Sequence, residues 1–385
     1  MITPEQMTAL QDALEKIAEP VTDYIIKDVI RRIMEAGQIT RTAEYLVKQA
    51  FWLRNSRDGL IVLLRKKNVP KAIINTFTKA ADIVYKQMGA EPDEISDDIL
   101  KAAIKLATQN FTNLTQTIGM VDPFGVALPM QQAYRSCTDY AFKMVLSGAQ
   151  SYQQACYEAS KNLIDQGVRV IDYESGRHTS VDAAIRRNIF GGMGLMVEQL
   201  EEHLHDQMGA NGWELSAHEA CAKDHEPYQG RQFTNAQYER LNGTATSPGI
   251  LKRRIGTLNC KHIAFPVILG VQKPIYSQKE LADMRARNRA GVTFEGKHYT
   301  MYEATQMQRQ IERAIRNQKR RITAFEQLPG QQDKLRAARI KYIALSRKYK
   351  EFSSVAGLRT QDARLLVEDF GPSQERRAYQ VEQSA

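Results

Sequence analysis

The stretch that decides the fold class is VTDYIIKDVIRRIM, residues 21–34. Its apolar side chains recur at positions 21, 25, 29, 30 and 33, which is the period of a helix with one apolar face. Pro20 precedes the stretch and Gly37 follows it, so we expect a helix to begin at Pro20 and a separate helix to cover about residues 4–18. An amphipathic helix can lay its apolar stripe on a neighbouring protein, and we expect this one to dock a partner.

The same periodicity continues along the first two hundred residues. Further helical segments are expected near 41–54, 70–88, 94–117, 127–147 and 151–165. A β-branched run from Gln166 to Tyr173 predicts one short strand. We therefore expect a helical, partner-docking region over residues 1–205.

The rest of the chain divides into two parts. Residues 206–298 contain many Gly, Pro, Asn and Thr residues and predict a small α+β domain with long loops. Residues 299–385 predict a basic helical hairpin and a tail, with Pro329-Gly330 as the turn. Its inward face is expected to hold Ile311, Ile322, Leu335, Tyr342 and Leu345. The predicted fold class is mainly α with a small α+β, loop-rich domain.

The composition of the 385 residues is that of an ordinary globular protein, with 43% hydrophobic and 25% charged residues. No apolar run approaches the roughly 20 residues that cross a bilayer. The first residues lack the features of a secretory leader, so we expect the chain to stay in the cytoplasm of its producing cell. The four scattered cysteines favour reduced thiols or a metal site over a disulfide framework.

The net charge of +9 resides in the C-terminal third of the chain. Residues 271–385 hold 23 Lys and Arg against 13 Asp and Glu. Such a surplus attracts nucleic acid or acidic surfaces, although interspersed acids are also typical of solvated helix faces. The candidates for a nucleic-acid contact are Arg316, Lys319, Arg320 and Arg321.

One group of residues carries chemistry that is unusual for this chain. His218, Cys221 and His225 lie in one segment, and Cys260 and His262 lie in another. Imidazole and thiolate are the ligands that zinc prefers, so the two segments could close one structural zinc site. The alternative is a metal-free, hydrogen-bonded polar cluster. Supporting residues for either arrangement are Cys221, Asp224, Tyr228, Gln229 and Arg231.

A catalytic role for the same group has less support than a zinc site or a hydrogen-bonded cluster. His218 and His225 would act as acid and base, with Arg231 stabilising negative charge, as in a nuclease. The chain offers no matching nucleophile or metal-binding carboxylates, no Walker phosphate loop and no His-Glu-x-x-His motif. We therefore expect no enzyme.

Several of these residues also form a recognisable set. The central segments are Ala217-His218, His225, Tyr228-Gln229-Gly230-Arg231, Asn259-Cys260-Lys261-His262 and Phe265-Pro266. In this order they resemble the signature of the phage minor capsid protein 2 family, which is distantly related to the Mu F-type head morphogenesis proteins. The family usually has Trp where this chain has Tyr228, and a Gly-Ala-Arg-Pro-like run at 220–223. The matching set is therefore His218, His225, Cys260 and His262, and Cys221 is the weaker ligand candidate.

The resemblance implies a structural component of a tailed-phage head rather than a reaction. It implies several copies at or inside the portal vertex, in contact with the portal protein and the major capsid protein, and no membrane. The expected location is the virion, after assembly in the host cytoplasm. Two alternatives stay open: a nucleic-acid-processing enzyme, and a head protein that contacts packaged double-stranded DNA through its basic C-terminal helices.

Overall fold

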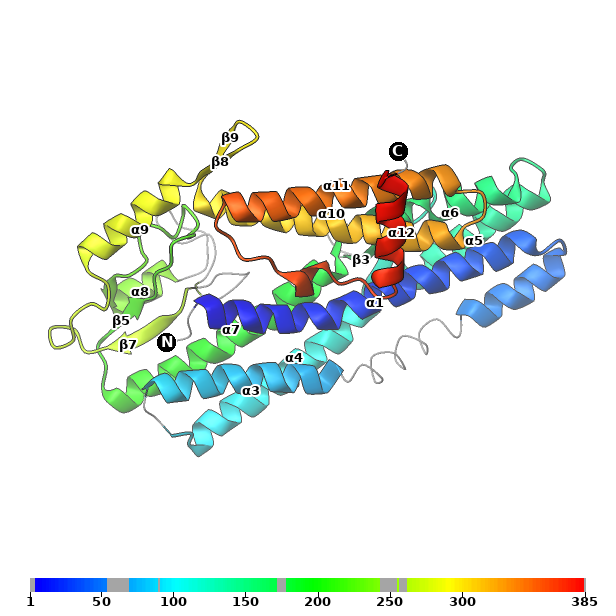
Figure 1. Cartoon of the computed structure of the whole chain (residues 1–385). Helices are drawn as coiled ribbons and strands as arrows, with labels where there is room; N and C mark the ends of the chain where they lie inside the picture. The colour runs from blue at the N-terminus through cyan, green and yellow to red at the C-terminus, as the bar shows by residue number, and fades with distance from the viewer. Residues whose placement is uncertain are drawn as a thin grey trace.

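The computed structural model describes residues 4–53, 69–88, 91–171, 178–242, 255 and 262–383. Long helices pack side by side along the molecule, and a smaller region with short strands forms one end (Figure 1). The helices of the first part are α1 (Pro4–Gln38), an unlabelled helix over residues 42–53, α3 (Val69–Met88), α4 (Glu94–Gln116), α5 (Met130–Leu146), α6 (Tyr152–Gln166) and α7 (Val181–Met208). The mainly α fold class is confirmed.

The expected boundary at Pro20 is wrong, because α1 runs unbroken from Pro4 to Gln38 with Pro20 inside it. Proline removes one helical hydrogen bond and clashes with the preceding turn, at about 3 kcal/mol. Packing of the following turns offsets this cost, since Val29, Ile30 and Ile33 are completely buried. The apolar stripe of residues 21–34 therefore lies in the core of its own chain and is not available to a partner.

A four-stranded antiparallel sheet interrupts the helices. Its strands are β1 (Ile118–Val121), β2 (Ala127–Pro129), β3 (Val168–Ile171) and β4 (His178–Ser180), in the order β2-β1-β3-β4. The expected strand corresponds to β3, but β1 and β2 were not predicted. Asp122 holds the turn between them, because its Oδ1 accepts hydrogen bonds from the amides of Phe124 at 2.9 Å and Val126 at 2.8 Å.

The C-terminal hairpin forms as predicted. It consists of α10 (Met301–Gln327) and α11 (Gln332–Val355), followed by the short 3-10 helix η1 (Asp362–Leu365) and α12 (Pro372–Gln383). Thr300 and Glu303 form a capping box that begins α10. Of the predicted inward residues, Ile311, Ile322 and Tyr342 are buried, and Leu335 and Leu345 are partly buried against the same core.

One continuous apolar core joins the first and last parts of the chain. It includes buried side chains of α1, α3, α4, α5, α6, α7, α10, α11 and α12. A buried ion pair between Asp23 of α1 and Arg320 of α10 crosses this core at 3.0 Å. We call this assembly the helical body. The predicted domain boundaries at 205/206 and 298/299 stay a prediction.

The smaller region at one end of the body contains the remaining elements. They are β5 (Gly212–Leu215), β6 (Gln232–Thr234), α8 (Asn235–Leu241), β7 (Ala264–Val267), α9 (Gln278–Ala290), β8 (Val292–Phe294) and β9 (Lys297–Tyr299). Strands β6, β5 and β7 form an antiparallel sheet, and β8 pairs with β9. A separate small apolar cluster consists of Trp213, Leu215, Tyr238, Leu241, Ile255 and Ala264. We call the part formed by β5, β6, α8, β7 and α9 the end region, whereas Phe294 of β8 and Tyr299 of β9 pack into the core of the helical body.

Candidate functional site

The sheet of the end region brings two distant segments together. Strands β5 and β7 are antiparallel neighbours, with Leu215 opposite Ala264. Beyond the strand ends, the amide of Ser216 donates to the carbonyl of Ile263 at 2.9 Å, and the amide of Ile263 donates to Ser216 Oγ at 2.9 Å. These bonds place His262 beside the loop that begins at Ala217.

That loop is folded back on itself by backbone hydrogen bonds. The amide of His225 donates to the carbonyl of Ala222, and the amide of Gln229 donates to the carbonyl of His225. Gly230 returns the chain to the sheet by donating to the carbonyl of Leu215 at 2.9 Å. Its φ of +66° favours glycine, and a Cβ at this position would lie 2.4 Å from Leu281. The Gln-Gly-Arg segment thus has a structural reason for its glycine.

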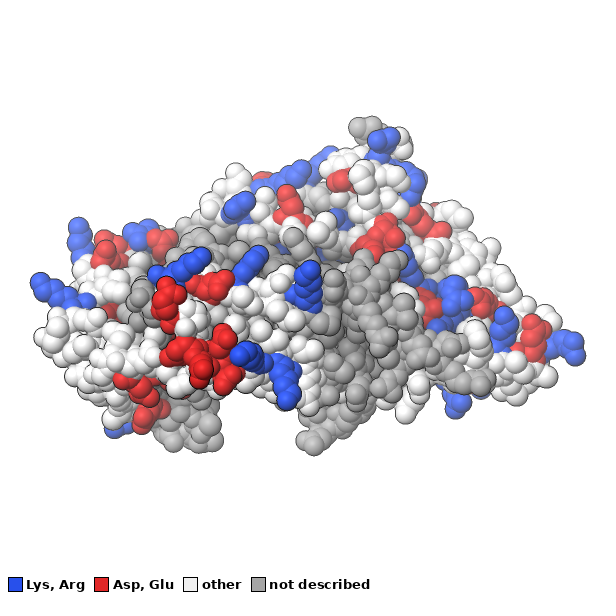
Figure 2. Space-filling view, turned by 90° about the horizontal axis from the view of Figure 1, so that it is seen from below, with Lys and Arg blue, Asp and Glu red and all other residues white. Residues whose placement is uncertain are grey.

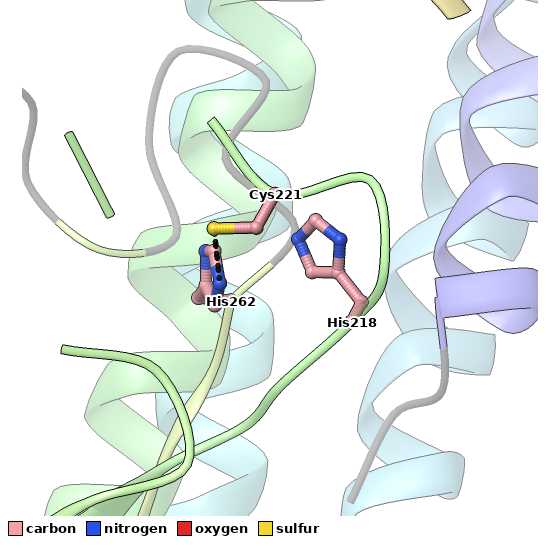
Figure 3. Close-up of side chains that lie close together, drawn as sticks. All are labelled: His218, Cys221 and His262. Carbon is pink, nitrogen blue, oxygen red and sulfur yellow. Dashed lines mark hydrogen bonds between the residues drawn. The ribbon is translucent and has the colours of Figure 1, made fainter. Parts of the chain in front are cut away.

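Three side chains with metal-binding atoms converge between the loop and His262. His218, Cys221 and His262 point toward one another (Figure 3), and their ligating atoms all lie within 4.8 Å of one another. Cys221 Sγ is 3.4 Å from His262 Nε2, and the rings of His218 and His262 are 4.5 Å apart. Cys221 and His262 are buried, and His218 is half-buried.

His225 approaches the opposite nitrogen of His262. The two Nδ1 atoms are 3.3 Å apart, which is a hydrogen-bonding distance for two neutral rings of complementary tautomers. Burial, together with the nearby His218 and His225, holds the pKa of His262 well below its usual range. Asp224 lies at the edge, with its Oδ2 3.8 Å from His225 Nε2. His262 is therefore a neutral ring, with both nitrogens facing polar neighbours.

Gln229 connects the two halves of the site. Its Oε1 accepts a hydrogen bond from the amide of His218 at 3.1 Å and lies 3.2 Å from His262 Nε2. Tyr228 packs against the small apolar cluster of the end region. The site is thus attached to the sheet by backbone bonds and to its surroundings by one amide and one aromatic side chain.

The comparison with protein families gives one match. A model described as phage minor capsid protein 2 matches residues 2–353, which is nearly the whole chain. The chain belongs to the phage minor capsid protein 2 family. It is a structural component of the phage head and is located in the virion. No match was found among curated proteins or solved structures.

In this minor capsid protein, three of the four residues of the predicted cluster come together, namely His218, His225 and His262. Cys260 lies outside the described residues. Cys221, which the resemblance makes the weaker candidate, lies in the group, and its thiol in the same segment as His218 was the signal in the sequence. Whether the group binds metal stays a prediction.

The catalytic alternative requires His218, His225 and Arg231 around an open cleft. His225 is buried and contacts His262, whereas the Arg231 side chain is exposed. The geometry is that of a buried, mutually bonded cluster. It gives the catalytic alternative no support, although no observation tests for a reaction.

The four basic residues of the predicted nucleic-acid contact are engaged within the chain. Arg316 donates to the carbonyl of Arg364 and Lys319 to that of Leu365, while Arg320 pairs with Asp23 and Arg321 with Asp165. Figure 2 shows basic and acidic side chains interspersed on the face that it displays. These contacts favour a role of the four side chains in holding the body together, and DNA contact through them stays untested.

None of the helices in the described part of this capsid protein combines the length and the apolar character that a bilayer crossing requires.

Proposed function

We propose that this minor capsid protein is assembled into the head at the portal vertex, in several copies, where it contacts the portal protein and the major capsid protein and catalyses no reaction. Assembly would take place in the host cytoplasm. Membership in the family supports a place in the head. The observation that supports a docking role for the first 205 residues is an apolar face on the helix over residues 42–53.

One face of this helix presents three apolar side chains outward. Leu46, Val47 and Phe51 are 57%, 72% and 58% exposed. Large apolar side chains that lie together on a surface are typical of a protein interaction site. The docking surface is therefore proposed to be the face formed by Leu46, Val47 and Phe51 and not the buried stripe of α1.

The opposite face of the same helix is firmly anchored. The Tyr45 ring stacks on that of Phe142 of α5, with centroids 4.1 Å apart. The Tyr45 hydroxyl donates to Asp139 at 2.5 Å, and Arg32 of α1 donates to the carbonyl of Trp52 at 2.6 Å. The exposed face is thus held in a fixed position. Docking therefore costs less conformational entropy, because the helix is already ordered.

Incorporation into heads tests this surface. A triple variant with Leu46→Gln, Val47→Gln and Phe51→Gln should fold, because exposed positions change stability little. We expect its amount in purified heads to fall at least about tenfold, the effect of losing roughly 1.4 kcal/mol of binding. Val355→Gln is the matched control, since Val355 is an exposed apolar residue of α11. Normal incorporation of the folded triple variant would exclude this face as the docking surface.

The position in the head needs a separate measurement. Cryo-electron microscopy of heads, reconstructed without icosahedral symmetry, should show density for the chain at the portal vertex. Density distributed over the whole shell would contradict the portal assignment, even if the docking surface were correct.

A further inference from the structure

The end region holds a buried group of metal-binding side chains that the structural role does not explain. We propose that His218, Cys221 and His262 bind one zinc ion. Thiolate and neutral imidazole are the preferred zinc ligands, and zinc sites with three protein ligands take a water molecule as the fourth. His218 is half-buried, so we place this water on its side of the site.

The distances agree with a tetrahedral ion. Zinc–sulfur and zinc–nitrogen bonds of about 2.3 and 2.0–2.1 Å place the two ligand atoms about 3.5 Å apart at a tetrahedral angle. Cys221 Sγ and His262 Nε2 are 3.4 Å apart. The three ligating atoms lie within 4.8 Å of one another, so a shift of at most about 1.5 Å in the His218 side chain completes the arrangement.

The neighbours of the three ligands also suit a metal site. A histidine that binds zinc through one nitrogen usually bonds through the other, which fixes its tautomer and orientation. His225 Nδ1 lies 3.3 Å from His262 Nδ1, on the side of the ring away from Cys221. Gln229 holds the backbone of His218, because its Oε1 accepts a 3.1 Å hydrogen bond from the His218 amide. Both ligand-bearing segments are therefore positioned before metal arrives.

The ion would cross-link segments that are far apart in the chain. His218 and His262 flank a long excursion that includes β6 and α8, and the apolar cluster beneath it is small. Metal binding in such a case contributes directly to folding free energy. The inferred role of the zinc is thus to stabilise the end region and does not depend on where the protein sits in the head.

Zinc content of the full-length chain, purified without a histidine tag, tests the proposal. We expect about one zinc per wild-type chain after dialysis against metal-free buffer. Cys221→Ser should lower the affinity for zinc by more than roughly 10–100-fold. That range is typical for loss of a residue that only hydrogen-bonds to a metal ligand. Cys156→Ala is the matched control, because Cys156 is buried in α6, within the core of the helical body and outside the end region.

A second variant covers the case in which Cys221→Ser does not fold. His218→Gln changes a half-buried side chain at the edge of the site, so it should fold and still lose zinc affinity at least about tenfold. Cobalt in place of zinc should give a thiolate-to-cobalt charge-transfer band in the wild type that Cys221→Ser lacks. Folded wild-type protein without zinc, or wild-type zinc affinity in either folded variant, would overturn the assignment.

Discussion

The helical body and the end region are held together in different ways. The body has one apolar core, to which nine of the described helices contribute buried side chains from both ends of the chain. The end region has a separate cluster of six buried apolar residues, and beside it lies the polar group of His218, Cys221, His225 and His262. Apolar burial scales with the area removed from water, so the body gains most of its stability from many contacts. The end region depends on a few specific ones.

This difference predicts how each part unfolds when a side chain is removed. Loss of one large core side chain in the body should lower the stability of the whole body, because its helices share one core. Loss of a key residue in the end region should open that region alone. The following changes test the two behaviours.

The largest effect is expected for Phe352→Ala in α11. Phe352 is completely buried, and its ring meets those of Phe294 and Tyr299 edge to face, at 5.2 and 5.7 Å. Truncation leaves a cavity and should lower the free energy of unfolding of the body by about 3–5 kcal/mol. Urea unfolding followed by far-ultraviolet circular dichroism measures it, with Phe352→Leu as the milder control. A loss below about 1 kcal/mol would mean that the core is less cooperative than described.

A more local effect is expected for Trp213→Ala in β5. The Trp213 ring stacks between those of His205 of α7 and Tyr238 of α8, at 4.8 and 5.1 Å. Its removal should lower the opening free energy of the end region by about 3 kcal/mol and leave the body unchanged. Amide hydrogen exchange distinguishes the two parts, and Trp213→Phe should retain most of the protection. Equal loss of protection in α10 and α11 would show that the parts unfold together.

The third effect, which is the smallest when it is measured over a single pH unit, concerns a buried carboxyl group in the body. Glu201 of α7 is 1% exposed, and burial raises its pKa from 4.5 to about 8. The folded chain therefore keeps a proton that the unfolded chain releases above about pH 4.5. The stability contributed by this group is complete below that pH and is lost as the pH rises through 8, at about 1.4 kcal/mol per pH unit.

Glu201→Gln should remove this dependence, because the amide is neutral at every pH. Urea unfolding at several pH values between about 5.5 and 7.5 measures the slope. Glu202→Gln is the control, since the adjacent Glu202 is exposed. The same slope in wild type and Glu201→Gln would show that another group causes it.

The sequence predicts the helices well where an apolar stripe is long. The α10–α11 hairpin was predicted with its turn and its inward residues, because its period persists over many turns. The sequence predicts short strands poorly. Strands β1 and β2 have four and three residues and lie directly between two helical patterns, so periodicity carries no signal for them. Pro20 misled the prediction because local propensity ignores the packing that surrounds α1.

The candidate site was predictable in composition but not in arrangement. The types of residue and their two segments were visible, whereas the pairing of β5 with β7 that joins them depends on the tertiary fold. Cys221 was discounted on family resemblance, although its thiol and its position in the same segment as His218 had already made it a candidate. For Arg316 and Arg320, charge alone could not distinguish a solvated face from buried contacts, which depend on partners such as Asp23 and Arg364.

The contacts of Asp23 also have a consequence for the order of events during synthesis. Its carboxylate accepts hydrogen bonds from Arg320 and from the amide of Glu368, which are 297 and 345 positions further along the chain. At about 5–20 residues per second, the ribosome needs roughly 17–70 s to reach the second of these partners after making Asp23. During that interval Asp23 and the part of α1 that α10 will cover have no native neighbours on this side. The body can therefore close around Asp23 only after translation has passed residue 368.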